Sequence, residues 1–329
     1  MVSKNEILVS VCCLAYNHEK YIKRTLEGFI SQKTTFNFEV LIHDDASTDN
    51  TQNIIKEYAE KYPDIIKPIL QKENQLSKGI NVQKTYNYPR IKGKYVAYCE
   101  GDDYWCDENK LQLQVDSLEM NNDCTISAHI TEIILKDGTS KKEFIPPHSL
   151  EKKIITIKEY LTSELVERNW TFHLSSFMVR KEIIDLLMED NITFIKAFNR
   201  IGDFALIAFS LTRGNLVFID RKMSCYRWMS GGFMSNWTKN SKSITDSFIN
   251  GYNELDKYTN YKYHDILAIG IKNCEFSQLI KEENFTKLTS EEYKFIYDNQ
   301  PKIKKFAINV GKHSKTLYHL LMKVYTTVK

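Results

Sequence analysis

Apolar residues along the first hundred positions follow two alternating patterns. Continuous apolar runs such as Ile7–Leu14 are typical of strands that are buried on both faces of a sheet. Between these runs, apolar residues recur every three or four positions among charged ones, which predicts helices with one buried face. The expected strands are residues 7–14, 38–43, 65–70 and 95–99, and the expected helices are residues 22–30 and 54–62. This alternation predicts an α/β fold with a doubly wound, mostly parallel central sheet, in which ligands bind beyond the carboxyl ends of the strands.

The second half of the chain is less regular. Strand-like runs occur at residues 125–135 and 216–219, and from about residue 241 the pattern becomes helical and polar. We therefore expect an α/β domain over residues 1–240 and a C-terminal helical region over residues 241–329. The end of that region is basic, because residues 301–329 contain seven lysines and no Asp or Glu.

Composition and charge exclude several classes of protein. A hydrophobic fraction of 42% and a charged fraction of 26% are those of a globular protein. The net charge of +3 is too small to indicate a nucleic-acid-binding protein. The cysteines have no C-x-x-C spacing, so neither a zinc site nor a disulfide framework is expected. No signal peptide and no apolar stretch of about 20 residues is present, so we expect a soluble, cytoplasmic protein.

Two acidic clusters follow predicted strands. HDDASTD contains Asp44 and Asp45, and EGDDYW contains Glu100 and Asp102. Each has a simpler interpretation, since Asp and Ser commonly cap helices and acidic turns are commonly solvated. At neighbouring strand ends, however, such carboxylates suit Mg²⁺ or Mn²⁺, which also take ligands from a substrate diphosphate. Histidines 18, 43, 129 and 173, four of the eight in the chain, lack metal-ligand spacing and are expected to be packed or on the surface.

The runs VSVCCLAYNHEKYI, HDDASTDNT and KGKYVAYCEGDDYW resemble, in this order, the motifs of the family-2 glycosyltransferases, which have the GT-A fold. The resemblance covers roughly residues 7–235. It implies that Asp102 binds Mn²⁺ or Mg²⁺, since Glu100, Gly101 and Asp102 stand at the D-x-D motif of the family. The residues it places beside the nucleotide-sugar are Ala15, Tyr16, Asn17, Asp44, Asp45, Lys84, Glu100, Gly101, Asp102 and Arg227.

The resemblance also implies a catalytic base, Asp203, about a hundred residues further on at the head of a helix. On residue type alone, Asp203 is equally well a helix cap. Arg227 belongs to YRWMSGGFMS, residues 226–235, which resembles a loop that closes over the diphosphate, with Gly231 and Gly232 permitting the closure. Ser224 stands where processive members have the Gln of Q-x-x-R-W, which favours single addition.

The resemblance therefore implies an inverting, metal-dependent, non-processive glycosyltransferase. Its donor would be a nucleotide-sugar, expected to be a UDP-sugar because members of the family commonly use UDP-sugars. Its acceptor would be a glycan or a lipid-linked glycan of the bacterial surface. The alternative is a catalytically silent homologue that serves as a binding or scaffold subunit. The basic C-terminal stretch, 301–329, predicts either a peripheral contact with the inner face of the cell membrane or a solvated helix packed on the protein. The absence of any G-x-G argues against a nucleotidyltransferase or a dinucleotide-binding protein.

Overall fold

The structure is a computed structural model of the chain. The residues that it describes are 6–147, 150, 152–169, 172–189, 192–198, 202–229 and 241–328. The chain divides into two compact units. The first comprises Met1–Glu164, Asn169–Ile192 and Asp203–Gly232, and the second comprises Leu165–Arg168, Thr193–Gly202 and Phe233–Lys329.

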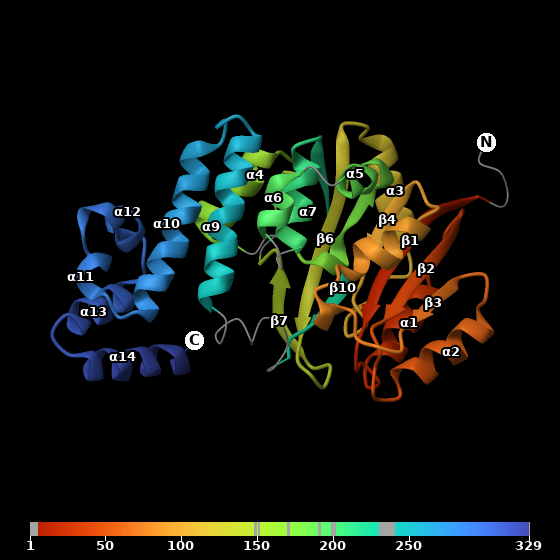
Figure 1. The fold of residues 1–329 in the computed structure, drawn as a ribbon, viewed down its shortest axis with the longest axis horizontal. Helices are drawn as coiled ribbons and strands as arrows, with labels where there is room; N and C mark the ends of the chain where they lie inside the picture. Colours follow the sequence, from red (N-terminus) through yellow and green to blue (C-terminus); the bar gives the residue numbers. More distant parts are fainter. Residues whose placement is uncertain are drawn as a thin grey trace. The chain divides into compact units, whose positions relative to one another are not determined.

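One half of the sheet in the first unit is parallel. Its strands are β1 (Ile7–Ala15), β2 (Asn37–Asp44), β3 (Ile66–Leu70) and β4 (Tyr95–Tyr98). They lie in the order β3-β2-β1-β4, and every neighbouring pair is parallel (Figure 1). All four were expected from the apolar runs, and each begins and ends within about one residue of its predicted range.

The other half of the sheet is mixed. Strand β9 (Met178–Arg180) runs antiparallel to both β4 and β6 (Cys124–Ile134), and β10 (Asn215–Arg227) is parallel to β6. The edge is formed by β5 (Tyr104–Trp105), antiparallel to β10. Strands β7 (Ser140–Ile145) and β8 (Ile154–Ile155) pair with β6 and β10, respectively. Strand β10 is much longer than the predicted 216–219. The prediction ended too early because residues 220–222, in the middle of the strand, are polar and the sheet register shifts there.

Helices cover the sheet through apolar faces. In α1 (Ile22–Ile30), residues Ile22, Leu26 and Phe29 are fully buried in the same core as strands β1 and β2. The other helices of the unit are α2 (Thr51–Lys61), α3 (Lys110–Met120), α4 (Ile157–Leu161), α5 (Lys181–Met188) and α7 (Gly202–Leu211). Single turns of 3₁₀ or π type are η1 (Leu76–Lys78), η2 (Gln83–Asn87), η3 (Tyr88–Arg90), η4 (Thr162–Glu167) and η5 (Leu174–Ser176).

The second unit is helical. Its elements are α6 (Thr193–Phe198), α9 (Ser241–Tyr258), α10 (His264–Lys281), α11 (Phe285–Leu288), η6 (Glu291–Tyr293), α12 (Lys294–Asp298), α13 (Lys302–Gly311) and α14 (Lys315–Val328). Helices α10 to α14 share a small core that includes Phe276, Phe285 and Leu288. Among the helices that the structure describes, none combines the length and the apolar character needed to cross a membrane.

Candidate active site

The carboxyl ends of β1, β2 and β4 meet at one edge of the sheet. Ala15, the last residue of β1, is paired with Asp44, and its carbonyl accepts a hydrogen bond from the amide of Asp45 (2.9 Å). The amide of Gly101 donates to the carbonyl of Leu14 (2.8 Å). The structure therefore brings both predicted acidic clusters to the end of β1.

The first cluster is bonded to its own chain. Asp44 is fully buried, and its carboxylate accepts hydrogen bonds from the amide and hydroxyl of Ser47 and from the side chain of Gln52 (2.7 Å). Asp45 is 6% exposed, and its two carboxylate oxygens accept the amides of Gln75 (2.7 Å) and Leu76 (3.0 Å). These bonds fix the loop between β2 and α2 and join it to the loop after β3.

The residues after β1 continue this loop structure. Asn17 has a left-handed backbone (φ 56°), and its side-chain oxygen accepts the amide of Thr48 (2.8 Å). Tyr16 is 45% exposed, so its ring is available to a ligand at this edge. Lys84 lies in η2 and is half-buried.

The second cluster keeps two of its carboxylates accessible. Glu100 is exposed and Asp102 is 19% exposed, whereas Asp103 is buried. Asp103 accepts hydrogen bonds from the hydroxyl of Ser175 (2.8 Å) and from the backbone amide of Arg227 (2.9 Å). Asp103 therefore holds the end of β10 against the loop, and Glu100 and Asp102 face solvent.

Only glycine fits at position 101. A Cβ atom there would lie 2.8 Å from Nδ1 of His18 and 3.0 Å from the side chain of Ile22. The absence of a side chain therefore allows the acidic loop to lie directly on the start of α1.

Crowding of negative charge changes the acidity of this cluster. The pKa of Glu100 is raised by loss of hydration among the surrounding protein atoms and by the charges of Asp102 and Asp203. Burial, followed by the charge of Asp102, raises the pKa of Asp103 well above its ordinary value. Any cation that binds here would relieve this repulsion.

Asp203 joins the cluster from a distant part of the sequence. It lies in the first turn of α7 and is half-buried, and burial raises its pKa to about 6. Burial raises the pKa of Tyr226 as well, and the charges of Asp103, Asp102, Glu100 and Asp203 add to that shift. The charges of four carboxylates from two segments thus act on one tyrosine of β10.

The fit of a metal ion can be judged from the donors. No hydrogen bond to the carboxylate of Asp102 is found within the described ranges, and Nε2 of His18 lies 3.9 Å from it. In the part of the chain that the structure describes, no three His, Cys, Asp or Glu side chains form a complete metal site. A single free carboxylate amid excess negative charge fits Mg²⁺ or Mn²⁺, which keep waters and complete their shell with substrate phosphates.

Arg227 ties this loop to a hairpin. Its Nε donates to the carbonyl of Asp102 (3.0 Å), and its Nη1 donates to the carbonyls of Leu135 (3.2 Å) and Lys136 (3.0 Å). The guanidinium also lies over the ring of Tyr21, 4.6 Å from its centre. Residues 230–235 of the predicted closing loop, which include Gly231 and Gly232, lie outside the described residues.

Sequence reasoning did not select three residues that the structure places at the site: His18, Asp103 and Tyr226. The only available signal was position, since His18 follows the end of β1, Asp103 belongs to the acidic run and Tyr226 precedes Arg227. His173, in contrast, is buried against Asp103, and burial lowers its pKa to about 3, so it is a neutral packed histidine as expected.

The match to known proteins agrees with this geometry. The family model for glycosyl transferase family 2 matches residues 10–213, which contain both acidic clusters and Asp203. The chain belongs to this family.

An uncharacterized protein of Mycobacterium tuberculosis is 38% identical over 161 residues, 49% of this chain and 45% of that protein. The putative teichuronic acid biosynthesis glycosyltransferase TuaG of Bacillus subtilis is 34% identical over 144 residues, 44% of this chain and 54% of TuaG. The chain thus spans about half the length of these family members.

Two solved structures have a similar fold. TarS 1–349 of S. aureus in complex with UDP-GlcNAc has a TM-score of 0.63 at 18% identity, over 98% of this chain and 93% of that one. The mannosyltransferase PcManGT from Pyrobaculum calidifontis, in complex with GDP-Man and Mn²⁺, has a TM-score of 0.53 at 13% identity, over 88% and 82%. At these identities the likeness concerns the fold, and it confirms the predicted GT-A architecture with a helical C-terminal region.

Proposed function

We propose that the chain is an inverting, metal-dependent, non-processive glycosyltransferase that moves a sugar from a UDP-sugar to an acceptor hydroxyl. The observation that carries this proposal is that the charge of Asp203, about a hundred residues further along the sequence, acts on Glu100 together with that of Asp102. A helix cap with no other role would not need to lie where its charge adds to an already crowded cluster.

In the proposed reaction, Asp203 acts as the general base. The acceptor oxygen attacks the anomeric carbon, its proton passes to a carboxylate oxygen of Asp203, and the bond from that carbon to UDP breaks on the opposite side. With a pKa of about 6, Asp203 is ionised at neutral pH and still basic enough to take a proton. Mn²⁺ or Mg²⁺ bound by Asp102 would supply positive charge beside the leaving diphosphate.

The donor and acceptor classes are taken from similar proteins. TarS binds UDP-GlcNAc, and the E. coli enzyme WfaP, 35% identical over 112 residues, is named as a UDP-Glc:alpha-D-GlcNAc-diphosphoundecaprenol glucosyltransferase. These names, with that of TuaG, support a UDP-sugar donor and a glycan or lipid-linked acceptor in surface-glycan synthesis. Ser224 stands at the position of the Gln of processive members, and this substitution supports single addition.

A thermal-shift screen of UDP-, GDP- and dTDP-sugars, each with and without Mn²⁺, tests the donor. A ligand that binds only the native state raises the melting temperature, so a shift confined to UDP-sugars with metal is expected. No shift with any donor, and no donor hydrolysis by the purified protein, would favour a silent scaffold subunit instead.

The variant Asp203→Asn tests the base. We expect transfer to fall by about 10³-fold or more, with donor affinity within about twofold of the wild type. Asp123→Asn, which changes an exposed Asp before β6, is the matched control and should keep full activity. A proportional loss of donor affinity in Asp203→Asn, with an unchanged fold, would assign this residue to donor binding.

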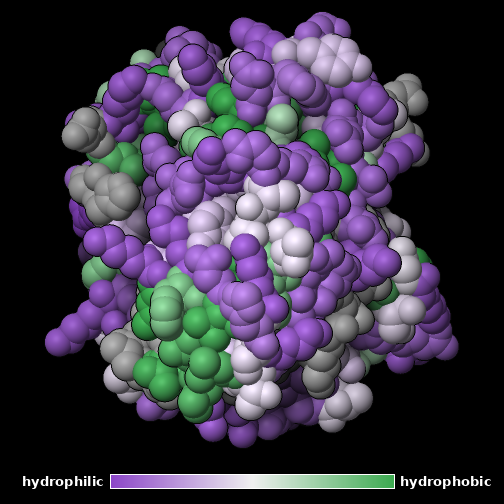
Figure 2. All heavy atoms as spheres, turned by 90° about the vertical axis from the view of Figure 1, so that its left-hand side faces the viewer, coloured by the Kyte–Doolittle hydropathy of each residue, from purple (hydrophilic) through white to green (hydrophobic). Residues whose placement is uncertain are grey.

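We also propose that the end of the chain contacts the cytoplasmic face of the cell membrane. Large apolar side chains are exposed on α13 and α14 among lysines, and Figure 2 shows a hydrophobic patch on the side where the C-terminal helices lie. The exposed apolar residues are Ile303, Phe306, Leu317, Leu320 and Val324. Such a combination suits an interfacial helix on anionic lipid.

Co-sedimentation with vesicles of phosphatidylglycerol and phosphatidylcholine tests this contact. The double variant Phe306→Ser, Leu320→Ser should bind several-fold less than the wild type, and raised salt should weaken wild-type binding. Equal binding by both proteins would show that this stretch is a solvated helical end.

A further inference from the structure

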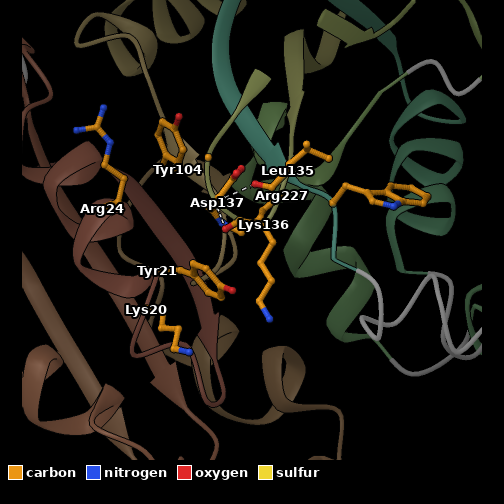
Figure 3. A pocket seen from close by; sticks show the side chains of 10 residues that line it. Lys20, Tyr21, Arg24, Tyr104, Leu135, Lys136, Asp137 and Arg227 are labelled. Atoms are coloured by element: carbon orange, nitrogen blue, oxygen red, sulfur yellow. Dashed lines mark hydrogen bonds between the residues drawn. The ribbon is translucent and has the colours of Figure 1, made fainter. Parts of the chain in front are cut away.

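A cavity of about 800 Å³ lies in the first unit, beside the acidic loop. Its walls come from the start of α1, from β5, from the turn between β6 and β7, and from the end of β10. Figure 3 shows Lys20, Tyr21 and Arg24 on one side and the turn residues Leu135, Lys136 and Asp137 on the other. The volume is in the range of sites for small molecules, and it exceeds that of a single phosphate.

The charge of this cavity is strongly positive. Four of its lining residues are cations: Lys20, Arg24, Lys136 and Arg227. Its only acidic lining residue, Asp137, accepts the amide of Thr139 (2.9 Å) within its own turn.

Little in the described chain neutralises these cations. Neither Lys20 nor Lys136 forms an ion pair with another described residue, and both are exposed. Arg24 has one carboxylate neighbour, Glu27, at 3.9 Å, and both side chains are well solvated. The guanidinium of Arg227 donates to carbonyl oxygens, and the carboxylate that its charge acts on within the cavity is that of Asp137.

Aromatic side chains complete the cavity. Tyr21 lies against Arg227, and the ring of Tyr104 lies 4.9 Å from the guanidinium of Arg24, so each ring orients a cation without cancelling its charge. Trp228 lines the same cavity and is 41% exposed. Cations beside exposed aromatic faces suit a ligand that has both an anionic group and sugar rings.

The position of the cavity separates it from the expected donor site. Ala15, Asn17 and Asp45, which should contact the nucleotide, do not line it. Arg227 is the one lining residue among those expected to contact the donor, and its side chain is bonded to the backbone of Asp102. A ligand in the cavity would therefore lie next to the carboxylate cluster, on the side of the loop away from β2.

We propose that this cavity binds a phosphate group of the acceptor, and so selects acceptors with phosphate close to the hydroxyl that is glycosylated. This inference rests on the proposed transfer reaction and names the acceptor chemistry. Two sources share that chemistry: the phosphodiester of a polyol-phosphate polymer and the diphosphate of a lipid-linked sugar.

Calorimetric titrations of the full chain with glycerol 3-phosphate, in the presence of saturating UDP and Mn²⁺, test the proposal. Glycerol is the uncharged control ligand. The variant Lys20→Glu, Lys136→Glu reverses two exposed charges of the cavity and should weaken glycerol 3-phosphate binding by about tenfold or more. The variant Lys56→Glu, Lys61→Glu makes the same charge change on exposed positions of α2 and should bind like the wild type.

Three results would overturn the proposal. The wild type could bind glycerol 3-phosphate no more tightly than glycerol, or both double variants could lose the same amount of affinity for glycerol 3-phosphate. The third is a parallel loss of UDP affinity in the Lys20→Glu, Lys136→Glu variant. The last would assign the cations to the donor. If UDP does not bind the wild type, the result contradicts the proposed transfer reaction and not the phosphate site. The titration with glycerol 3-phosphate can then be run without UDP. Titration with geranyl diphosphate separates the two sources, since tighter binding than glycerol 3-phosphate indicates a lipid diphosphate and weaker binding a polyol phosphodiester.

Discussion

The two acidic clusters follow β2 and β4, the strands on either side of β1, yet they differ in what their carboxylates do. After β2, the carboxylates of Asp44 and Asp45 each accept hydrogen bonds from the chain itself. After β4, Glu100 and Asp102 remain accessible, and only the buried Asp103 is bonded to the protein.

The difference shows how one motif type serves two purposes. Internal donors stabilise the first cluster, which shapes the loops where a nucleotide is expected. In the second cluster, loss of hydration and then repulsion between carboxylates raise the pKa of Glu100 and of Asp103. Substitutions in the first should therefore lower stability, and substitutions in the second should lower activity.

The largest effect is expected for Asp102→Asn. Loss of the charge that would hold the metal should lower kcat/KM by about 10³-fold, which corresponds to about 4 kcal/mol in the transition state. The melting temperature should stay unchanged or rise, because repulsion on Glu100 falls. Steady-state kinetics measure kcat/KM, and a calorimetric scan measures the melting temperature. A lower melting temperature for Asp102→Asn would contradict the expectation that the second cluster serves activity and not stability.

For Asp44→Ala the free energy of unfolding should fall by about 2–4 kcal/mol, because a buried carboxylate is lost and its donors from Ser47 and Gln52 are left without a partner. Urea denaturation measures the change. Asp49→Ala, at a half-buried position in the same loop, is the comparison and should cost less. An unchanged stability with lost donor binding would make Asp44 a ligand-binding residue.

The pH dependence should reveal the pKa of Asp203. Since the base must be ionised, kcat/KM should rise about tenfold per pH unit below pH 6 and level off above it. Folding raises this pKa from 3.8 to about 6, so the native state binds the extra proton and stability falls as the pH rises through that window. At pH 7.5, Asp203→Asn should thus gain about 1 kcal/mol, the partial solvation of the side chain being allowed for. Chemical denaturation of both proteins at pH 4 and pH 7.5 measures this change in the free energy of unfolding. A gain in stability for Asp203→Asn at pH 4 alone would contradict the prediction.

The smallest effect is expected at Ala46, beside the first cluster. Its backbone is left-handed (φ 63°), which is unfavourable for a residue with a Cβ atom. Ala46→Gly should therefore stabilise the protein by about 0.5–1 kcal/mol, with activity unchanged. Equilibrium unfolding in urea measures it, and a destabilised variant would show that the loop tolerates this conformation without strain.

Much of the first unit could be predicted because its strands are apolar runs with clear ends. The four parallel strands and the helices α1 and α2 were expected, as was the position of both acidic clusters at one edge. The long strand β10 could not be delimited, since the polar residues Asp220 to Lys222 interrupt its apolar pattern. Strand β5 has only two residues, too few for a periodicity to be visible.

At the site, prediction worked where residues follow strand ends and failed where contacts depend on tertiary structure. Asp203 was found through its distance along the chain from the acidic motif. The action of four carboxylate charges on Tyr226, and the cationic cavity around Lys20 and Lys136, arise from segments that no local pattern connects. The assigned roles of the individual site residues stay predictions until the variants are measured.

The pairing of β5 with β10 limits how this chain can change length. Trp105 is opposite Ser224 and Tyr104 is opposite Cys225, immediately after the acidic loop and immediately before Arg227. One inserted or deleted residue between positions 100 and 105 would shift this register and exchange the two aromatic rings between the faces of the sheet. The turn at residues 136–139, which is exposed, has no such restriction. In an alignment of homologues, a gap within 100–105 would therefore mark a chain in which this pairing is changed, whereas a gap at the turn would leave the pairing intact.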